Sequence, residues 1–182
     1  KYRKNMKTVI VVISAYNGAK HIERQLDSIF QQVGVDVQVL VRDDCSKDNT
    51  VEVVQEYAQN HPQNKIEIIK GENVGFAKSF WLGLSMCRDA DYYAFADQDD
   101  VWKEEKIISA VKCIENIDKP ALYSSAVEVV DKDLTFIRKS FTDNTFKNPL
   151  YDILTYGTPG CTFVFNKALM EKLKQYKPSV IS

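Results

Sequence analysis

The sequence predicts an α/β fold with a mostly parallel central sheet flanked by helices, followed by a C-terminal part of mixed strands and helices. Residues 8–15 form a continuous apolar, mostly β-branched run, which is typical of a strand covered on both faces. Strand-like runs and helix-like segments then alternate four times before Pro120, and short loops join them. After Pro120 the alternation gives way to further strands, so the 182 residues are expected to form one domain with two differing halves.

The alternating half has a simple expected order. Its helical segments carry apolar residues at intervals of three or four, whereas its strands are short apolar runs. Turn signals separate them, among them Asn17-Gly18, Gly34 and Pro62. The expected strands are residues 8–15, 35–41, 66–69 and 92–96, and the expected helices are residues 19–32, 49–60, 76–88 and 104–117.

The second half is expected to begin with two strands, residues 121–130 and 134–139, which form a hairpin. A short helix over 149–156, a loop over 157–160 and a strand over 161–165 follow. A last helix is expected over 166–176, with Asn166 as its N-cap because Asn is a favoured capping residue.

Composition excludes several classes of protein. With 24 Lys+Arg against 25 Asp+Glu, the chain has no basic stripe for nucleic acid and no charged tail. Its four cysteines form no C-x-x-C pair, so neither a zinc site nor a disulfide framework is indicated, and reduced thiols in a cytoplasmic protein are expected. The longest apolar run, residues 9–13, falls short of the ~20 residues needed to span a bilayer, and no signal peptide is expected.

An acidic cluster ends the fourth expected strand. Asp97, Asp99 and Asp100 follow an aromatic and apolar run and surround Gln98. Carboxylate oxygens suit Mg²⁺ or Mn²⁺, which commonly bind one or two carboxylates together with substrate phosphates. The alternative is that these residues cap the helix expected to start near Lys103.

Three further groups follow the other parallel strands. In an open parallel sheet, ligands bind beyond the carboxyl ends of the strands, where these groups converge with the acidic cluster. Tyr16 is expected either to stack on a planar base or to pack in the core, and Asp44 either to accept a hydrogen bond from a base N–H or to cap a turn. Asn73 and Gly75 either approach a ligand closely or form a helix entry.

Four motifs, taken in order, carry a resemblance to a known family. VIVVISAYNG, VLVRDDCSKDNT, ENVGFAKSFWLGL and AFADQDDVW resemble the motifs of family 2 glycosyltransferases, which use nucleotide sugars and have the GT-A (Rossmann-like) fold. The resemblance covers roughly residues 7–173. The sequence of the last motif, DQDDVW, is most similar to that of bacterial rhamnosyltransferase-like members, which act on polysaccharide or O-antigen precursors.

The resemblance implies roles for individual residues. It implies a nucleotide pocket in which Tyr16 lies against the base and Asp44 hydrogen-bonds it, while Asp99 is the chief metal ligand and Asp97 lies toward the ribose or the metal. Where many members carry an Arg-Asn pair, this chain has Phe80-Trp81. Lys78 is then expected to take over a phosphate contact, or the helix is purely structural. The implied nucleotide-binding residues are Ser14, Ala15, Tyr16, Asp44, Asn73, Gly75, Lys78 and Asp97.

The implied reaction is inverting transfer of a sugar from a UDP- or dTDP-linked donor, with dTDP-rhamnose one such donor. The acceptor is a saccharide or lipid-linked molecule of cell-surface polysaccharide synthesis, and Mn²⁺ or Mg²⁺ acts as the Lewis acid. Residues 7–120 would form the nucleotide-binding half and residues 121–182 the acceptor half. The family's general-base motif does not occur between Leu173 and Ser182, so the base is expected beyond Ser182, with Asp131 or Asp152 as the alternatives. Further sequence is also expected to allow peripheral association with the inner face of a membrane.

Two other classes stay open at this point. A nucleotidyltransferase would want a Gly-rich basic loop after the first strand, and residues 16–20 are a poor match. A non-catalytic receiver or nucleotide-binding module could use Asp43 and Asp44 as an acidic pocket, although the second acidic cluster fits such a module badly.

Overall fold

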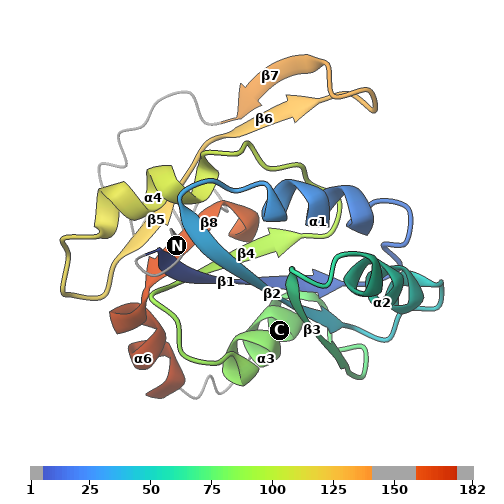
Figure 1. The fold of residues 1–182 in the computed structure, drawn as a ribbon, viewed down its shortest axis with the longest axis horizontal. Helices are drawn as coiled ribbons and strands as arrows, with labels where there is room; N and C mark the ends of the chain where they lie inside the picture. The colour runs from blue at the N-terminus through green and yellow to red at the C-terminus, as the bar shows by residue number, and fades with distance from the viewer. Residues whose placement is uncertain (1–5, 141–158, 176–182) are drawn as a thin grey trace.

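The computed structural model describes residues 6–140 and 159–175 of the chain. Their main sheet has six strands in the order β3-β2-β1-β4-β8-β5 (Figure 1). The four strands of the first half pair in parallel, as the alternating sequence pattern predicts. These strands are β1 (Lys7–Ala15), β2 (Val35–Asp43), β3 (Lys65–Lys70) and β4 (Tyr92–Asp97).

The register of the parallel strands brings their carboxyl ends to one edge. Ser14 of β1 lies beside Arg42 of β2 on one side and beside Asp97 of β4 on the other. The loops that follow these three strands therefore begin as direct neighbours, although they are far apart in the sequence.

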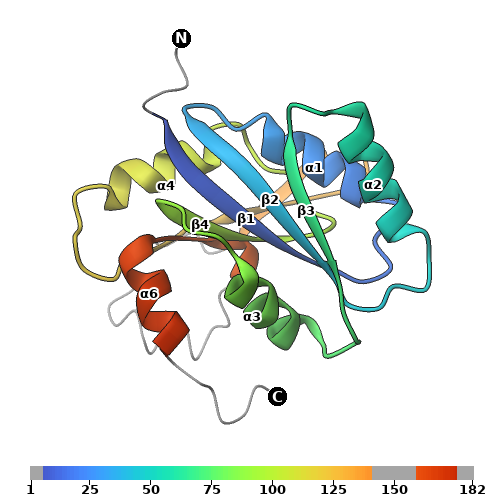
Figure 2. The same cartoon turned by 60° about the horizontal axis from the view of Figure 1, so that its bottom comes forward.

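Helices cover both faces of this sheet (Figure 2). One face packs against α1 (Ile22–Phe30), α2 (Thr50–Asn60) and α4 (Lys106–Ile114). The opposite face packs against α3 (Phe76–Met86) and α6 (Lys167–Gln175). Successive residues of a strand point to opposite faces, so β1 must be apolar at nearly every position to fill both cores.

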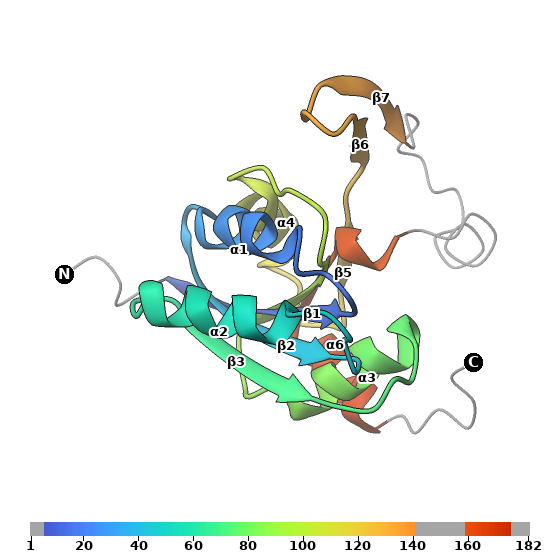
Figure 3. The same cartoon turned by 90° about the vertical axis from the view of Figure 1, so that its right-hand side faces the viewer.

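The second half completes the sheet and adds a separate hairpin. β8 (Phe163–Asn166) runs antiparallel between β4 and β5 (Leu122–Ser124). Among the described strands, β6 (Val127–Val130) and β7 (Phe136–Ser140) form a second, two-stranded sheet that lies away from the main sheet (Figure 3). The expected hairpin is therefore present. An ion pair of 2.7 Å between Lys103 and Glu128 connects β6 to the segment before α4.

Asn166 caps α6 as expected. Its side-chain oxygen accepts hydrogen bonds from the backbone N–H groups of Leu169 and Ala121, both at 3.0 Å. Its amide nitrogen donates to the carbonyls of Ile117 and Lys119. One side chain thus joins the start of α6 to the segment that leads into β5.

Several expected boundaries are wrong. The continuous strand over 121–130 is two strands in different sheets, because β5 pairs with β8 whereas β6 pairs with β7. The strand over 161–165 begins later, after a 3₁₀ turn (η2, Gly160–Thr162) that closes on the carbonyl of Pro159. The helix over 19–32 starts only at Ile22, because residues 18–21 form a tight turn first.

Other expectations concern parts of the chain outside the described residues. The helix expected over 149–156 lies there, as does Asp152, one of the two alternatives for the general base. Among the described helices, none combines the length and the apolar character needed to cross a bilayer. All four cysteines are free thiols, as expected from their spacing.

Candidate functional site

The candidate site lies at the carboxyl edge of the parallel strands. The backbone N–H of Asp44, just after β2, donates to the carbonyl of Ala15 at the end of β1 with a length of 2.8 Å. Asp97 ends β4 on the other side of β1. Residues of three expected motifs therefore meet at this edge.

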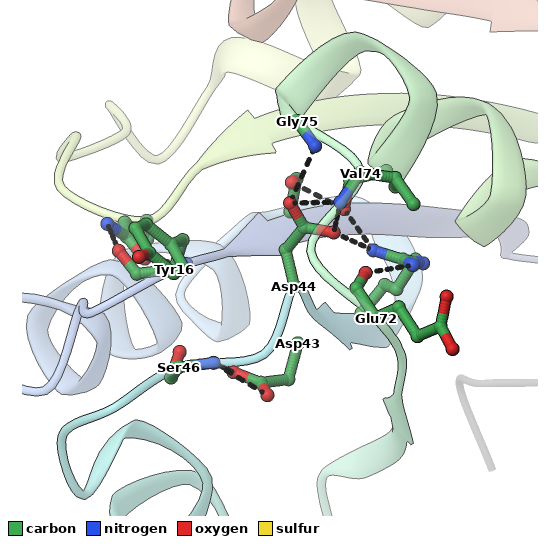
Figure 4. A network of polar contacts seen from close by, with 11 residues as sticks. Tyr16, Asp43, Asp44, Ser46, Glu72, Val74 and Gly75 are labelled. Atoms are coloured by element: carbon green, nitrogen blue, oxygen red, sulfur yellow. Dashed lines mark hydrogen bonds and ion pairs between the residues drawn. The ribbon is translucent and has the colours of Figure 1, made fainter.

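A buried ion pair lies at the centre of this edge (Figure 4). Nη1 of Arg42 lies 2.5 Å from Oδ1 of Asp44, and both side chains are almost fully buried. The carboxylate of Asp44 also accepts hydrogen bonds from the backbone N–H groups of Val74 and Gly75 at 2.9–3.2 Å. Burial alone would raise the pKa of Asp44, but Arg42 and these backbone donors outweigh it and hold the pKa below its usual value.

Arg42 extends the network to β1 and α3. Its guanidinium donates to Oγ of Ser79 at 2.9 Å and to the carbonyl of Glu72 at 3.1 Å. Oγ of Ser14 in turn donates to Oγ of Ser79 at 2.7 Å. Gly71 leaves room for the guanidinium, because a Cβ there would lie 2.4 Å from Nη2 of Arg42.

These contacts bear on three expected nucleotide-binding residues. Ser14, Ala15 and Asp44 all lie at the expected edge, but each is engaged by another part of the protein. A carboxylate has about four acceptor positions, and three donors already contact that of Asp44, with the N–H of Val74 shared between its two oxygens. This arrangement favours a role for Asp44 in holding the Val74–Gly75 backbone, while its direct contact with a base stays a prediction.

Four other expected nucleotide residues, Tyr16, Asn73, Gly75 and Lys78, are open to solvent, whereas Asp97 is half-buried. Tyr16 is 44% exposed and follows β1 directly. Asn73 and Lys78 are exposed on either side of Gly75, whose φ of +81° is a conformation that glycine adopts readily. Their side chains are therefore free to approach a ligand at this edge.

Two of the three acidic residues at the end of β4 lie in one cluster. Carboxylate oxygens of Asp97 and Asp100 lie within 4.8 Å of each other and of the Sγ atom of Cys161. Asp99 is exposed and is not part of this cluster. The helix-cap alternative is wrong, because the N-terminus of α4 has Glu105 at its cap position and no side-chain cap.

The cluster has the electrostatics of a cation site. Burial raises the pKa of Asp97, and the neighbouring charges of Asp100 and Asp99 raise it further, against the opposing effects of a hydrogen bond with Cys161 and of the charge of Lys106. A divalent cation would relieve this repulsion, and carboxylate oxygens are the ligands that Mg²⁺ and Mn²⁺ prefer. The described residues therefore fit such an ion.

Cys161 fits the cluster as a neutral thiol. Burial and the adjacent carboxylates raise its pKa well above the usual value, so the thiol keeps its proton and acts as a hydrogen-bond donor to Asp97 and Asp100. The hard cations that suit the carboxylates have little affinity for such a thiol. As a neutral thiol, Cys161 orients the two acids through these hydrogen bonds.

Lys106 holds the segment around Cys161 against α4. Its Nζ atom lies 2.5 Å from the carbonyl oxygen of Cys161 and 3.7 Å from the centre of a Trp102 ring. Burial lowers the pKa of Lys106 to about 8. The ammonium group thus joins α4 to the turn that faces the acidic cluster.

Gln98 connects the acidic loop to Tyr16. The Tyr16 N–H donates to Oε1 of Gln98 at 2.8 Å, and Nε2 of Gln98 donates to the Tyr16 carbonyl at 2.9 Å. The two loops are therefore joined by a pair of hydrogen bonds as well as by the sheet.

A hollow of about 390 Å³ opens beside Asp97. Apart from that carboxylate, its walls are mainly aromatic and come from α3, β4, the start of β8 and the segment before it. Its volume lies within the range of small-molecule sites. The aromatic walls are formed by Phe76, Phe80, Trp81, Phe95 and Phe163.

Sequence reasoning missed the parts of the site that act through long-range contacts. No role was assigned to Arg42, Gln98 or Cys161. A signal existed for Arg42, because a charged residue inside an apolar strand is rarely buried without a partner. Asp131, an alternative general base, accepts backbone hydrogen bonds from Asp133 and Thr135, which makes it a turn residue of the β6–β7 hairpin.

Comparison with known proteins identifies the family. The profile of Glycosyl transferase family 2 matches residues 10–174. The dTDP-rhamnosyl transferase RfbG of Shigella flexneri is 30% identical over 169 residues, which cover 90% of this chain and 57% of that protein.

Solved structures show the same fold. The S. aureus TarS fragment 1–349 in complex with UDP-GlcNAc matches with a TM-score of 0.69 at 22% identity, covering 95% of this chain and 49% of that one. The Pyrobaculum calidifontis mannosyltransferase PcManGT in complex with GDP-Man and Mn²⁺ matches with a TM-score of 0.65 at 22% identity, covering 94% of this chain and 48% of that one. The chain thus spans about half the length of these proteins. It belongs to glycosyl transferase family 2 and has the GT-A fold.

Proposed function

We propose that the chain forms the donor-binding part of an inverting glycosyltransferase that uses a nucleotide sugar and a divalent cation. The observation that carries this proposal is the acidic loop after β4, which stands next to Tyr16 at the carboxyl edge of the sheet in a family 2 chain. Neither a nucleotidyltransferase nor a non-catalytic module has comparable support, since the family match covers residues 10–174.

The acidic loop would hold the metal. Asp97 and Asp99 are the proposed ligands, and the proximity of Asp100 to Asp97 makes Asp100 a further candidate. When bound, Mn²⁺ or Mg²⁺ supplies the positive charge that stabilises the departing nucleoside diphosphate. Asp97, whose pKa is raised mainly by burial, must lose its proton before it can serve as a ligand.

The nucleoside would lie against Tyr16. An exposed aromatic ring beside the strand ends offers a stacking surface, and stacking of a base on an aromatic side chain contributes about 1–3 kcal/mol in nucleic-acid complexes. Lys78, exposed on the first turns of α3, is proposed to approach the diphosphate, with Asn73 and Gly75 beside it. Asp44 is proposed to act on the base directly or through the backbone that it holds.

The sugar would occupy the aromatic hollow. The sugar is bonded to the phosphate that the metal binds, so it must lie within a few bond lengths of Asp97, where the hollow opens. A buried hydroxyl without a hydrogen-bond partner costs about 1–3 kcal/mol, so mainly aromatic walls favour a sugar with a methyl group in place of a hydroxymethyl group. dTDP-rhamnose, the donor in the name of the Shigella relative, is such a sugar nucleotide.

The proposal for the acceptor half names a class of acceptor. We propose a saccharide or lipid-linked acceptor from cell-surface polysaccharide synthesis, bound on the side of residues 121–182. Because the chain spans about half the length of its relatives, transfer itself is best tested in the longest available form of the protein.

The test is a calorimetric titration with UDP and TDP, each in EDTA and in Mn²⁺. The proposal expects tighter binding of at least one nucleotide in Mn²⁺, and it expects Asp97→Asn and Asp99→Asn to remove that gain. Asp118→Asn, at an exposed carboxylate after α4, is the matched control and should leave the gain intact. Absence of binding, or a gain that survives both substitutions in the acidic loop, contradicts the proposal.

A further inference from the structure

Gln98 lies in the middle of the acidic loop, and its amide binds the backbone of the loop after β1. Both ends of its amide are engaged by the backbone of Tyr16, with bond lengths of 2.8 and 2.9 Å. Both the oxygen and the nitrogen of the amide are thus engaged by the loop after β1. Its two neighbours, Asp97 and Asp99, are the proposed metal ligands.

The loop after β1 is shaped to receive this side chain. A Cβ at Gly18 would lie 2.2 Å from Oε1 and 2.5 Å from Cδ of Gln98, so the Gln98 amide occupies the space that any larger residue would fill. The N–H of Gly18 is held from the other side by Oγ1 of Thr50 at 2.8 Å. The turn that carries Tyr16 is therefore fixed between the Gln98 amide and the start of α2.

We propose that Gln98 is a positioning residue that couples metal binding to base binding. This inference rests on the proposed function, in which Tyr16 holds the base and the acidic loop holds the metal. A nucleoside diphosphate with its metal ion spans both places at once. This ligand binds best when the distance between the base site and the metal site is fixed before it arrives. The Gln98 amide fixes that distance by joining the two loops directly.

The coupling has a measurable form. In EDTA, UDP binding depends on the Tyr16 side of the site, whereas in Mn²⁺ the same ligand must also reach the acidic loop. The UDP dissociation constant in EDTA divided by that in Mn²⁺ therefore reports how well the base site and the metal site are held at the distance that the ligand needs. A role limited to stability would change both constants alike and leave the ratio unchanged.

The experiment compares Gln98→Met with the unmodified chain. Methionine keeps the length of the side chain but removes both hydrogen bonds to Tyr16. We expect the ratio to fall about fivefold to tenfold, while the affinity for uridine, which has no diphosphate, changes less than twofold. Gly18→Ala should lower the ratio in the same direction, because its Cβ displaces the Gln98 amide. Gln55→Ala, at an exposed position on α2, is the control.

Two outcomes overturn the inference. A ratio that is unchanged in both Gln98→Met and Gly18→Ala, whether or not UDP affinity falls, shows that the amide does not couple the sites and has at most an ordinary structural role. A fall in the ratio that persists undiminished in a Tyr16→Ala background, which keeps the backbone that Gln98 binds but lacks the ring, shows that Gln98 does not act through base binding at Tyr16. If the unmodified chain binds UDP and TDP no better in Mn²⁺ than in EDTA, the proposed function itself fails, which distinguishes that failure from the other two.

Discussion

Replacing Asp44 by asparagine should destabilise the fold as well as affect ligand binding. The substitution leaves the Arg42 guanidinium buried without its counter-charge, since both side chains are almost fully shielded from solvent. The new amide NH₂ group must also face either the N–H donors of Val74 and Gly75 or the Arg42 guanidinium, and it can accept no hydrogen bond from them. Breaking a buried ion pair by removing one partner costs about 3–5 kcal/mol.

That loss is large enough to measure by unfolding. For a domain of 182 residues, each kcal/mol changes the melting temperature by about 2–4 °C, so Asp44→Asn should melt about 6–20 °C lower than the unmodified chain. Urea unfolding should give the same free-energy difference. Asp43→Asn is the matched control, because Asp43 accepts a hydrogen bond from Ser46 that an amide oxygen can also accept, and its effect should stay within about 1 kcal/mol.

The pH dependence adds a second readout. The pKa of Asp44 is lowered in the folded chain, so its stabilising contribution is complete above the ordinary value of 3.8 and is lost as the pH falls toward the lowered value. The difference between the unmodified chain and Asp44→Asn should therefore shrink in acid. A loss of less than about 1 kcal/mol at neutral pH, with weaker UDP binding, would refute this reasoning and favour direct contact between Asp44 and the base.

Three further predictions follow from other contacts. Gly71→Ala should destabilise the chain by about 1–3 kcal/mol, because its Cβ would overlap the Arg42 guanidinium, and an unchanged urea midpoint would contradict this. Asn166→Ala should lower the free energy of unfolding by at least about 1 kcal/mol, because α6 loses its helix cap. The carbonyls of Ile117 and Lys119 also lose their donor, which adds to the loss, and thermal melting measures the total. The gain in UDP affinity from Mn²⁺ should fall as the pH falls through the pKa of Asp97, because a protonated carboxyl group is a poor metal ligand. Since that pKa is raised, the gain should be lost at a higher pH than it would be for an aspartate with the ordinary pKa of 3.8. A gain that stays constant down to pH 3.8 would show that Asp97 is not a ligand.

The parallel half of the fold was predictable because its signals are local. The run in β1 is apolar at nearly every position since helices cover both faces of that strand. The stripe on α1 has the helical spacing of a single buried face, with Ile22, Leu26 and Ile29 in the core. Parallel pairing then follows from the alternation of strands and helices, and it brings Tyr16, Asp44 and Asp97 to one edge.

The rest depended on contacts between distant segments. Nothing near Phe163 in the sequence indicates that β8 pairs with both β4 and β5, and this pairing splits the expected strand over residues 121–130. The Gln98 amide contacts a backbone 82 residues away, so its role cannot be read from the acidic loop alone. The Asp44 carboxylate was expected to be available for a base. It is instead bonded to Arg42, Val74 and Gly75, and these contacts depend on where the segment leading into α3 lies against the edge of the sheet.

The most direct test of the proposed function is a crystal structure with Mn²⁺ and UDP or TDP, in which anomalous scattering locates the metal. The account predicts a manganese peak within coordination distance of carboxylates in the Asp97–Asp100 loop, with the diphosphate on the same ion and the base against the ring of Tyr16. A metal bound elsewhere on the chain, or a nucleotide that contacts neither Tyr16 nor that loop, would contradict it.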